Sequence, residues 1–155
     1  MADNRAHNPS VSMEDANFVH QATAGAVAEV MMGQLAAERA TGDPARRLGQ
    51  LMVADHTNKD QELRQILQGL SLQPATEPGP EQLAQYQQLR NAPADHFDET
   101  YARIFLEEHR WMIAVFEREI ASGQDSALKS FAMRTLPMVK EHLAMAEKIV
   151  LMHSR

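Results

Sequence analysis

The chain of 155 residues contains no cysteine. Disulfides, thiolate nucleophiles and cysteine-based zinc or iron–sulfur sites are therefore excluded. Basic residues are also scarce: 15 Lys and Arg face 21 Asp and Glu, which gives a formal net charge of -6 at pH 7. No basic patch offsets this deficit, and the phosphate backbone of a nucleic acid would be repelled. We therefore expect no nucleic-acid partner.

The sequence also lacks a run of about 18 apolar residues, the length that a membrane-spanning helix needs. The opening residues, MADNRAHNPSVS, are polar and lack the apolar centre of a signal peptide. We expect either a cytoplasmic protein or an exported protein whose leader has been removed. Enzyme motifs are absent as well, because there is neither a glycine-rich phosphate loop nor a nucleophile motif for Ser-His-Asp catalysis. The sequence therefore names no reaction.

Helical periodicity runs through most of the chain, and no strand pattern interrupts it. Ser12, followed three residues later by Asp15, is typical of a helix cap, and Asp43–Pro44 is typical of the start of a second helix. Pro137 should kink the last helix, since proline lacks a backbone donor. The pattern predicts four long helices over about 12–41, 43–69, 94–122 and 125–152.

One long connection separates the second helix from the third. The stretch SLQPATEPGPEQ holds three prolines, and PEQLAQYQQLRNA can form a short, glutamine-rich surface helix. The other two connections are tight turns, so neighbouring helices should run antiparallel. We therefore predict an all-α, ferritin-like, antiparallel up-down four-helix bundle with a short extra helix between helices 2 and 3. Residues 12–155 would form this single domain, and residues 1–11 a disordered tail.

Each long helix interrupts its apolar face near the middle with an ionisable residue. These residues are Glu29, His56, Glu108 and His142, with His109 next to Glu108. Glu29 and His56 lie about 13 residues on either side of the turn at Gly42–Asp43, so they should lie level at the ~1.5 Å rise of a helix.

The third and fourth helices match less well in height. His142 lies about one helical turn too far from the turn at Gly123 to match Glu108. Met138 is the better match for Glu108 and His109. Met138, His142 and Met145 also follow one another on one helix face as a Met–His–Met ladder, a set of ligands that can bind copper. Methionines at such positions more often fill gaps in the apolar core.

Carboxylates and imidazoles aimed into a helix bundle are the usual ligands for metal ions there. The candidate ligands are Glu29, His56, Glu108, His109 and His142, for iron, manganese, zinc or copper. A di-iron pattern would need a Glu-x-x-His step on two helices, and the chain has none. Two alternatives stay open: the same groups form a hydrogen-bonded network without a metal, or they are exposed.

An acid directly precedes a histidine on three helices, in Asp55–His56, Glu108–His109 and Glu141–His142. Adjacent helix positions point about 100° apart, so both side chains cannot reach one ion without strain. Such an acid can instead support a histidine ligand from a neighbouring helix. Asp55, Tyr101, Met138 and Met145 are the candidates for residues that surround the ligands.

Five segments carry a resemblance to a known family. They are FVHQATAGAVAEVMMGQLAAERA, LMVADHTNKDQEL, HFDETYARIFLEEH, FEREIASGQDSALKSFAMRTLP and HLAMAEKI. In their order and in the Leu136–Pro137 break, they resemble a bacterial family built on a domain of unknown function, over about Phe18 to Ile149. Its members are often labelled predicted outer-membrane or exported proteins and have a ferritin-like bundle.

This resemblance implies a ferritin-like four-helix fold and export to the periplasm or cell envelope, but no reaction. The recurrent positions of the family fall here on Glu29, Asp55, His56, Tyr101, His109 and His142. Members commonly have Asp-His where this chain has Glu108–His109. Duplication of a helical hairpin would account for the two acid–histidine pairs in VADHT and LEEHR.

Two functions of different classes follow. The first is a metal-binding, ferritin-like protein with a role in envelope or oxidative stress. The second is a non-catalytic structural or protein-interaction bundle whose buried acids and histidines form a polar network. A homodimer is compatible with both, and the sequence names no face for it.

Overall fold

All regular structure is helical in the computed structural model, which describes residues 11–154. The tail expected at residues 1–11 lies outside the described residues, except for its last position. No strand occurs between residues 11 and 154, which confirms the predicted all-α class. Within the same range, no helix combines the length and the apolar character that crossing a membrane requires.

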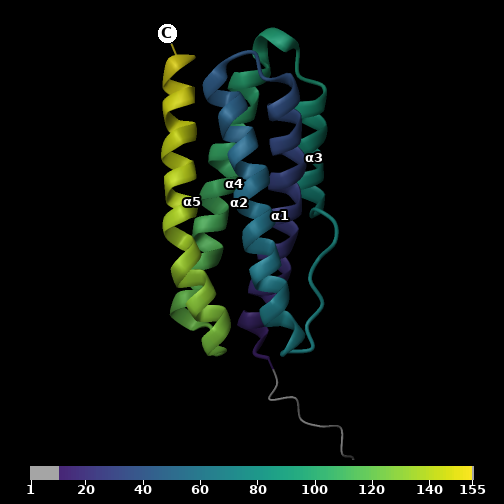
Figure 1. The fold of residues 1–155 in the computed structure, drawn as a ribbon, viewed down its shortest axis with the longest axis vertical. Coiled ribbons are helices and arrows are strands. Elements are labelled where there is room, and N and C mark those ends of the chain that lie inside the picture. The colour runs from purple at the N-terminus through teal and green to yellow at the C-terminus, as the bar shows by residue number, and fades with distance from the viewer. Residues whose placement is uncertain (1–10, 155) are drawn as a thin grey trace, which may run out of the picture.

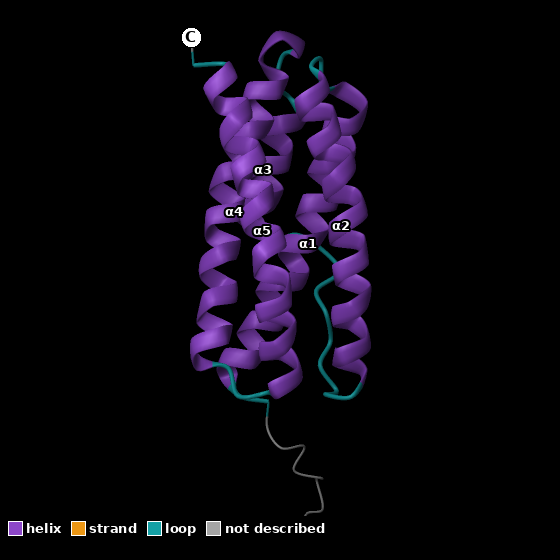
Figure 2. Cartoon of the chain, turned by 60° about the vertical axis from the view of Figure 1, so that its left-hand side comes forward, coloured by secondary structure: helices purple, strands orange, loops and turns teal. Residues whose placement is uncertain are grey.

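Residues 11–154 contain five α-helices and one short 3-10 helix. They are α1 (Met13–Arg39), α2 (Asp43–Gln68), α3 (Pro80–Arg90), η1 (Ala94–His96), α4 (Phe97–Ser122) and α5 (Ser126–Met152). Figure 1 shows α1, α2, α4 and α5 side by side along the long axis of the molecule, with α3 next to α1. The segment between α2 and α3 runs back along the helices as an extended loop (Figure 2).

The helix ends follow the local signals in the sequence. The Ser12 Oγ accepts a hydrogen bond from the Asp15 backbone N–H at 3.1 Å, which satisfies a free donor in the first turn of α1. Asp125 caps α5 in the same way, with its Oδ1 2.9 Å from the Leu128 nitrogen. The last helix continues through Pro137 to Met152.

Two glycines allow α1 and α2 to approach closely. A Cβ atom placed on Gly49 would lie 2.6 Å from the carbonyl oxygen of Gly33, and one on Gly33 would lie 2.9 Å from the Gly49 carbonyl oxygen. Only glycine leaves room for this contact between backbones. The contact lies between Glu29 and the end of α1, about one to two helical turns from the buried Glu29 and His56.

The apolar interior consists of two clusters with a polar layer between them. The cluster drawn higher in Figure 1, called the upper core, includes Met32, Leu48, Phe97, Phe105 and Ile149. The lower core includes Phe18, Leu63, Phe116, Leu128 and Val139. On α2, α4 and α5, the buried histidine falls between the residues that the helix gives to the two cores, and on α1 Glu29 directly follows Ala28, the first residue of that helix in the upper core.

Candidate metal centre

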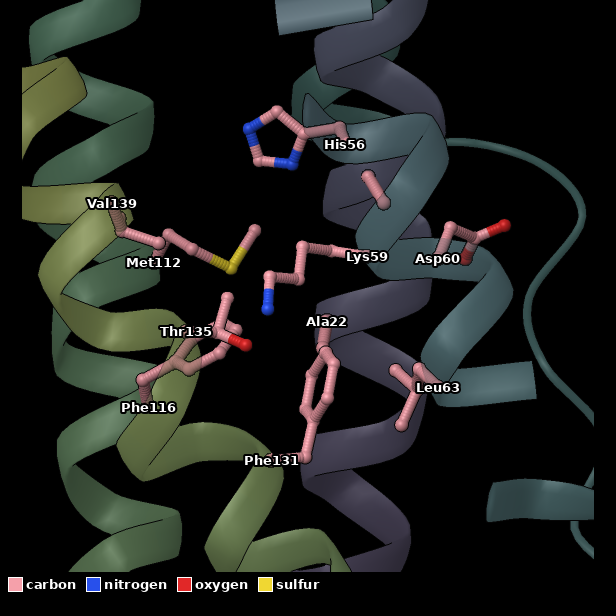
Figure 3. A pocket seen from close by; sticks show the side chains of 11 residues that line it. Ala22, His56, Lys59, Asp60, Leu63, Met112, Phe116, Phe131, Thr135 and Val139 are labelled. Carbon is pink, nitrogen blue, oxygen red and sulfur yellow. The ribbon is translucent and has the colours of Figure 1, made fainter. Parts of the chain in front are cut away.

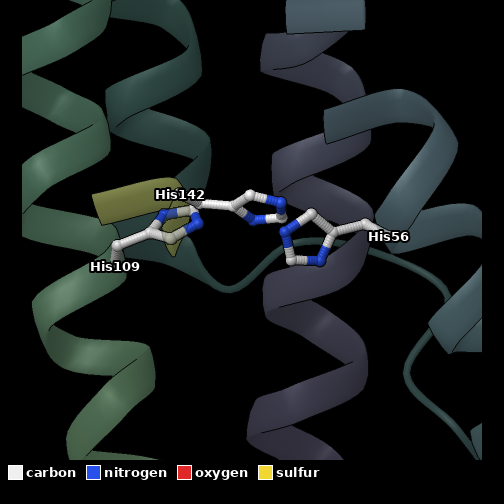
Figure 4. Close-up of side chains that lie close together, drawn as sticks. All are labelled: His56, His109 and His142. Carbon is white, nitrogen blue, oxygen red and sulfur yellow. The ribbon is translucent and has the colours of Figure 1, made fainter. Parts of the chain in front are cut away.

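Three histidines from three helices meet in the polar layer. His56 of α2, His109 of α4 and His142 of α5 each offer a ring nitrogen, and the three nitrogens lie within 4.8 Å of one another. Their ring centroids are 5.7 to 5.9 Å apart. Figure 4 shows one nitrogen of each ring directed towards the other rings. All three side chains are buried, with at most 5% of their surface exposed.

His142 lies level with His109, and this corrects the expectation that Met138 would take that place. Counting Cα atoms from the turn ignores the direction of the side chains. Each Cα–Cβ bond tilts towards the N-terminus of its helix. His109 therefore leans away from the turn after α4, while His142 leans back towards the turn before α5. These two displacements close the gap of about one helical turn.

Burial keeps the three imidazoles uncharged. It lowers the pKa of His56 well below its ordinary value, with further lowering by His109 and His142. Burial lowers the pKa of His109 to about 3. Burial also lowers the pKa of His142, against an opposing effect of its bond to Asp55. At neutral pH each ring therefore keeps a lone pair, which is the state that binds a metal ion.

Asp55 lies behind His142 and not behind its sequence neighbour His56. The Asp55 Oδ2 lies 2.8 Å from His142 Nε2. A carboxylate only accepts hydrogen bonds, so this contact requires the proton on Nε2 and leaves Nδ1 with the lone pair. His142 Nδ1 is buried and has no hydrogen-bond partner among the described residues. The acid thus orients a histidine on another helix.

Glu29 occupies the corresponding position behind His109. Its Oε1 lies 3.4 Å from His109 Nδ1, and both side chains are 1% exposed. Within residues 11–154, neither Glu29 oxygen and neither His109 nitrogen has a hydrogen-bond partner. Burial raises the pKa of Glu29 to about 8. The His109 ring is held flat against Phe105, with ring centroids 3.7 Å apart and planes 13° apart.

Tyr101 lies in the same polar layer. Its side chain is 1% exposed, and its hydroxyl has no hydrogen-bond partner in the described part of the chain. Burial raises the pKa of Tyr101, and the neighbouring Glu29 carboxylate raises it further. The phenol is therefore a neutral hydroxyl next to Glu29.

Glu108 does not join the histidine cluster. Its Oε1 accepts a hydrogen bond from Gln82 Nε2 at 2.6 Å, and its side chain borders a groove of about 570 Å³ between α1, α3 and α4. Burial raises the pKa of Glu108 to about 8, with a further contribution from Glu29. The exposed acids Glu81 and Glu107 line the same groove.

Gln82 was missed by the sequence reasoning, which treated its helix as a surface piece. The side chain is 6% exposed, and its Oε1 also accepts from the Gly79 backbone N–H at 2.8 Å. One signal was present: Gln82 follows Gly79–Pro80 at the position from which a side chain reaches back to cap a helix.

The structure does not bring the two candidate methionines into the cluster. Met138 packs against the lower core. Met145 is 36% exposed and borders a groove with Arg47 and Lys148 at the other end of α5. These positions give no support to a Met–His–Met copper ladder.

Comparison with solved structures gives a match that covers nearly the whole fold. The crystal structure of a DUF305 fragment from Deinococcus radiodurans matches with a TM-score of 0.79 and 13% sequence identity, over 92% of this chain and 98% of that chain. At this identity the similarity concerns the fold alone. No curated protein matches the chain. The family described as "Domain of unknown function (DUF4142)" matches over residues 1–149. The chain therefore belongs to the DUF4142 family.

Proposed function

We propose that this protein binds one transition metal ion in its interior through His56, His109 and His142. The observation that carries the proposal is the convergence of three buried, uncharged imidazoles on one point. A carboxyl group lies behind two of them: Asp55 behind His142, and Glu29 behind His109, where Glu29 would lose its proton when a metal ion binds nearby. Carboxylates behind histidine ligands are typical of metal sites, because they fix the ring and make it more basic.

We also propose a ferritin-like, antiparallel four-helix bundle for residues 12–155, as one domain. Two short turns support this, because three residues join α1 to α2 and three join α4 to α5. The pairs α1–α2 and α4–α5 make the most extensive contacts between helices. Bundles of this kind carry metal ligands on the facing sides of their helices.

The donor atoms suit a particular set of ions. Three imidazole nitrogens favour zinc, copper or iron over manganese, which prefers oxygen ligands. Three protein ligands leave one position of a tetrahedral ion open to solvent or to a small ligand. In this assignment Glu29 is a partner of His109 and not a ligand, unlike the sequence-based prediction. Glu108 belongs to the neighbouring groove, where acidic groups attract cations.

The alternative is a structural polar network without a metal. The bonds of Asp55 to His142 and of Gln82 to Glu108 would belong to it. A closed network satisfies its members, because an unpaired buried polar group costs about 1–3 kcal/mol. In the polar layer, seven of the buried side-chain atoms have no hydrogen-bond partner among the described residues. They are Glu29 Oε1 and Oε2, His56 Nε2, Tyr101 Oη, His109 Nδ1 and Nε2, and His142 Nδ1. A metal ion that takes one nitrogen from each histidine would satisfy three of these seven atoms, and this favours the metal.

Titration with Co(II), a spectroscopic substitute for zinc, tests the proposal. We expect one equivalent to bind to the wild-type protein with visible d–d absorption. His109→Ala should abolish this absorption. His96→Ala is the matched control, because His96 is 66% exposed and far from the cluster in sequence. If the wild-type protein binds no Co(II), zinc, copper or iron after loading, the metal proposal is wrong and the network remains.

A role in the cell envelope follows if the protein is exported, as the family resemblance implies. A buried site with three imidazole ligands would sequester a redox-active ion away from peroxide. A strain that lacks the gene should then be more sensitive to excess copper or iron. Wild-type sensitivity of this strain would contradict the envelope-stress role without affecting the metal site.

A further inference from the structure

A small cavity lies against His56 on the side of the lower core. Its volume of about 20 Å³ is enough for a particle of the size of one water molecule. Most of its wall is apolar and comes from all four long helices, with Ala22, Met112 and Val139 among the residues. The polar groups that border it include Lys59 and Thr135 (Figure 3).

Thr135 directs a hydroxyl into this space without a hydrogen-bond partner. The side chain is 2% exposed, and its Oγ1 has no partner within residues 11–154. A threonine hydroxyl inside a helix usually bonds a backbone carbonyl of the preceding turn. In Figure 3 the oxygen of Thr135 points into the cavity instead. The hydroxyl is therefore a free donor in a mostly apolar wall.

Lys59 brings a positive charge to the same cavity. Its side chain is 28% exposed, and its ammonium reaches into the cavity on the side of Thr135 (Figure 3). One of its three donors serves Glu62, at 3.2 Å from Nζ to Oε2. Asp60 also borders the cavity, but its Oδ2 lies 2.7 Å from Arg64 Nε, and Figure 3 shows its carboxylate turned away.

His56 completes the set of donors. Figure 4 shows one ring nitrogen of His56 directed at the other two histidines, and Figure 3 shows the second nitrogen on the side of the cavity. For the first nitrogen to bind a metal, the proton of the neutral ring must lie on the second. A carboxyl group lies beside the second ring nitrogen of His142 and beside a ring nitrogen of His109. The second ring nitrogen of His56 borders the cavity instead.

We propose that this cavity binds a small inorganic anion, of the size and chemistry of a halide, held by His56, Lys59 and Thr135. Three donors face the cavity, and an acceptor with negative charge matches the ammonium and takes the role that a carboxylate has behind the other two histidines. The volume excludes sulfate and phosphate, which carry four oxygens. A cation is excluded by Lys59.

Anion and metal should bind cooperatively. The anion fixes the proton on the cavity side of His56 and so keeps the lone pair of the ring directed at the cluster. By thermodynamic linkage, each ligand then raises the affinity for the other by the same factor, typically about 5-fold or more. The anion site itself does not depend on a metal, whereas this coupling rests on the proposed function.

Crystals of the protein soaked in sodium bromide test the anion site directly. We expect an anomalous bromide peak between His56, Lys59 and Thr135. Thr135→Val and Lys59→Met should remove the peak, and Thr135→Ser should keep it. Lys140→Met is the matched control, because Lys140 is 57% exposed and its removal changes the charge equally. A peak that is absent from wild-type crystals, or that persists in both cavity variants, would overturn the anion site.

Co(II) titrations with and without chloride, at constant ionic strength with gluconate, test the coupling. Chloride should tighten Co(II) binding about 5-fold or more in the wild-type protein and in Lys140→Met. It should have no effect in Thr135→Val or Lys59→Met, while one Co(II) still binds. Equal chloride effects in all four proteins would overturn the coupling. A bromide peak in a protein that binds no Co(II) would refute the proposed metal function and the coupling, but not the anion site.

Discussion

Replacing Glu29 by glutamine should stabilise the metal-free protein and weaken its metal binding. The carboxyl group of Glu29 is 1% exposed and has no hydrogen-bond partner among the described residues. Glutamine keeps the shape of the side chain and removes the ionisable group. The substitution therefore separates the loss of folding stability caused by the buried carboxyl group from its contribution to metal binding.

The magnitude follows from the pKa of Glu29, which burial raises from 4.5 to about 8. Between these two values the folded protein holds a proton that the unfolded chain releases, so stability falls as pH rises. Below pH 4.5 both states are protonated and the penalty vanishes. At pH 7 the penalty is about 3 kcal/mol. Glu29→Gln should recover about 1–3 kcal/mol of it, because the buried amide also needs partners.

Urea unfolding of the metal-free protein at pH 4.5 and pH 7 measures this effect. The gain should appear at pH 7 and not at pH 4.5, as a free energy of unfolding that is about 1–3 kcal/mol higher and a denaturation midpoint at higher urea concentration. Glu117→Gln on the exposed side of α4 is the control and should change stability by less than about 0.5 kcal/mol. A variant that is less stable than wild type at pH 7 would refute the reasoning, because Glu29 would then be ionised and well paired.

The same variant should bind Co(II) more weakly. Without its carboxylate partner, His109 loses basicity and a fixed orientation, which typically lowers metal affinity about 10–100-fold. Ligand-induced stabilisation depends on affinity, so Co(II) should raise the melting temperature less in Glu29→Gln than in wild type. Equal shifts in the two proteins would show that Glu29 has no part in metal binding.

Three further predictions concern other parts of the molecule. Asp55→Asn should raise the Kd for Co(II) about 10–100-fold in a titration, and an unchanged Kd would contradict its role behind a ligand. Burial, with the hydrogen bond and charge of Asp15, raises the pKa of Glu119 from 4.5 to about 9, so stability should fall between these pH values. Glu119→Gln should reduce this fall of the free energy of unfolding with pH, as measured by urea unfolding. An unchanged pH dependence would contradict the role of Glu119. Gly49→Ala should cost about 1–3 kcal/mol, because its Cβ would lie 2.6 Å from a backbone oxygen of α1. Gly69→Ala is its control, with no contact closer than 3.7 Å, and an equal effect of both would refute the close packing.

The helices and their ends could be predicted from the sequence because their causes are local. Ser12 and Asp125 cap helices through bonds to residues three positions away. The 3.6-residue period identifies the buried face, so it also identified which helices carry a buried acid or histidine. The start of α4 differed by three residues, since Ala94–His96 form a 3-10 helix first.

The assignment of partners could not be predicted in the same way. Sequence spacing placed Met138 opposite His109, whereas the lean of the side chains brings His142 there. Gln82 was expected at the surface, but the fold of the long connection buries it against Glu108. Both outcomes depend on residues that are distant in the chain.

The sequence by itself therefore determined the all-α class, the four long helices and the presence of a buried acid or histidine in the middle of each. Only the tertiary structure decided that three histidines converge, that Asp55 and Glu29 stand behind two of them, and that a cavity lies behind the third. The physical reason is that periodicity fixes the direction in which a side chain leaves its own helix. The height, tilt and separation of neighbouring helices fix what that side chain meets, and these follow from packing of the whole molecule.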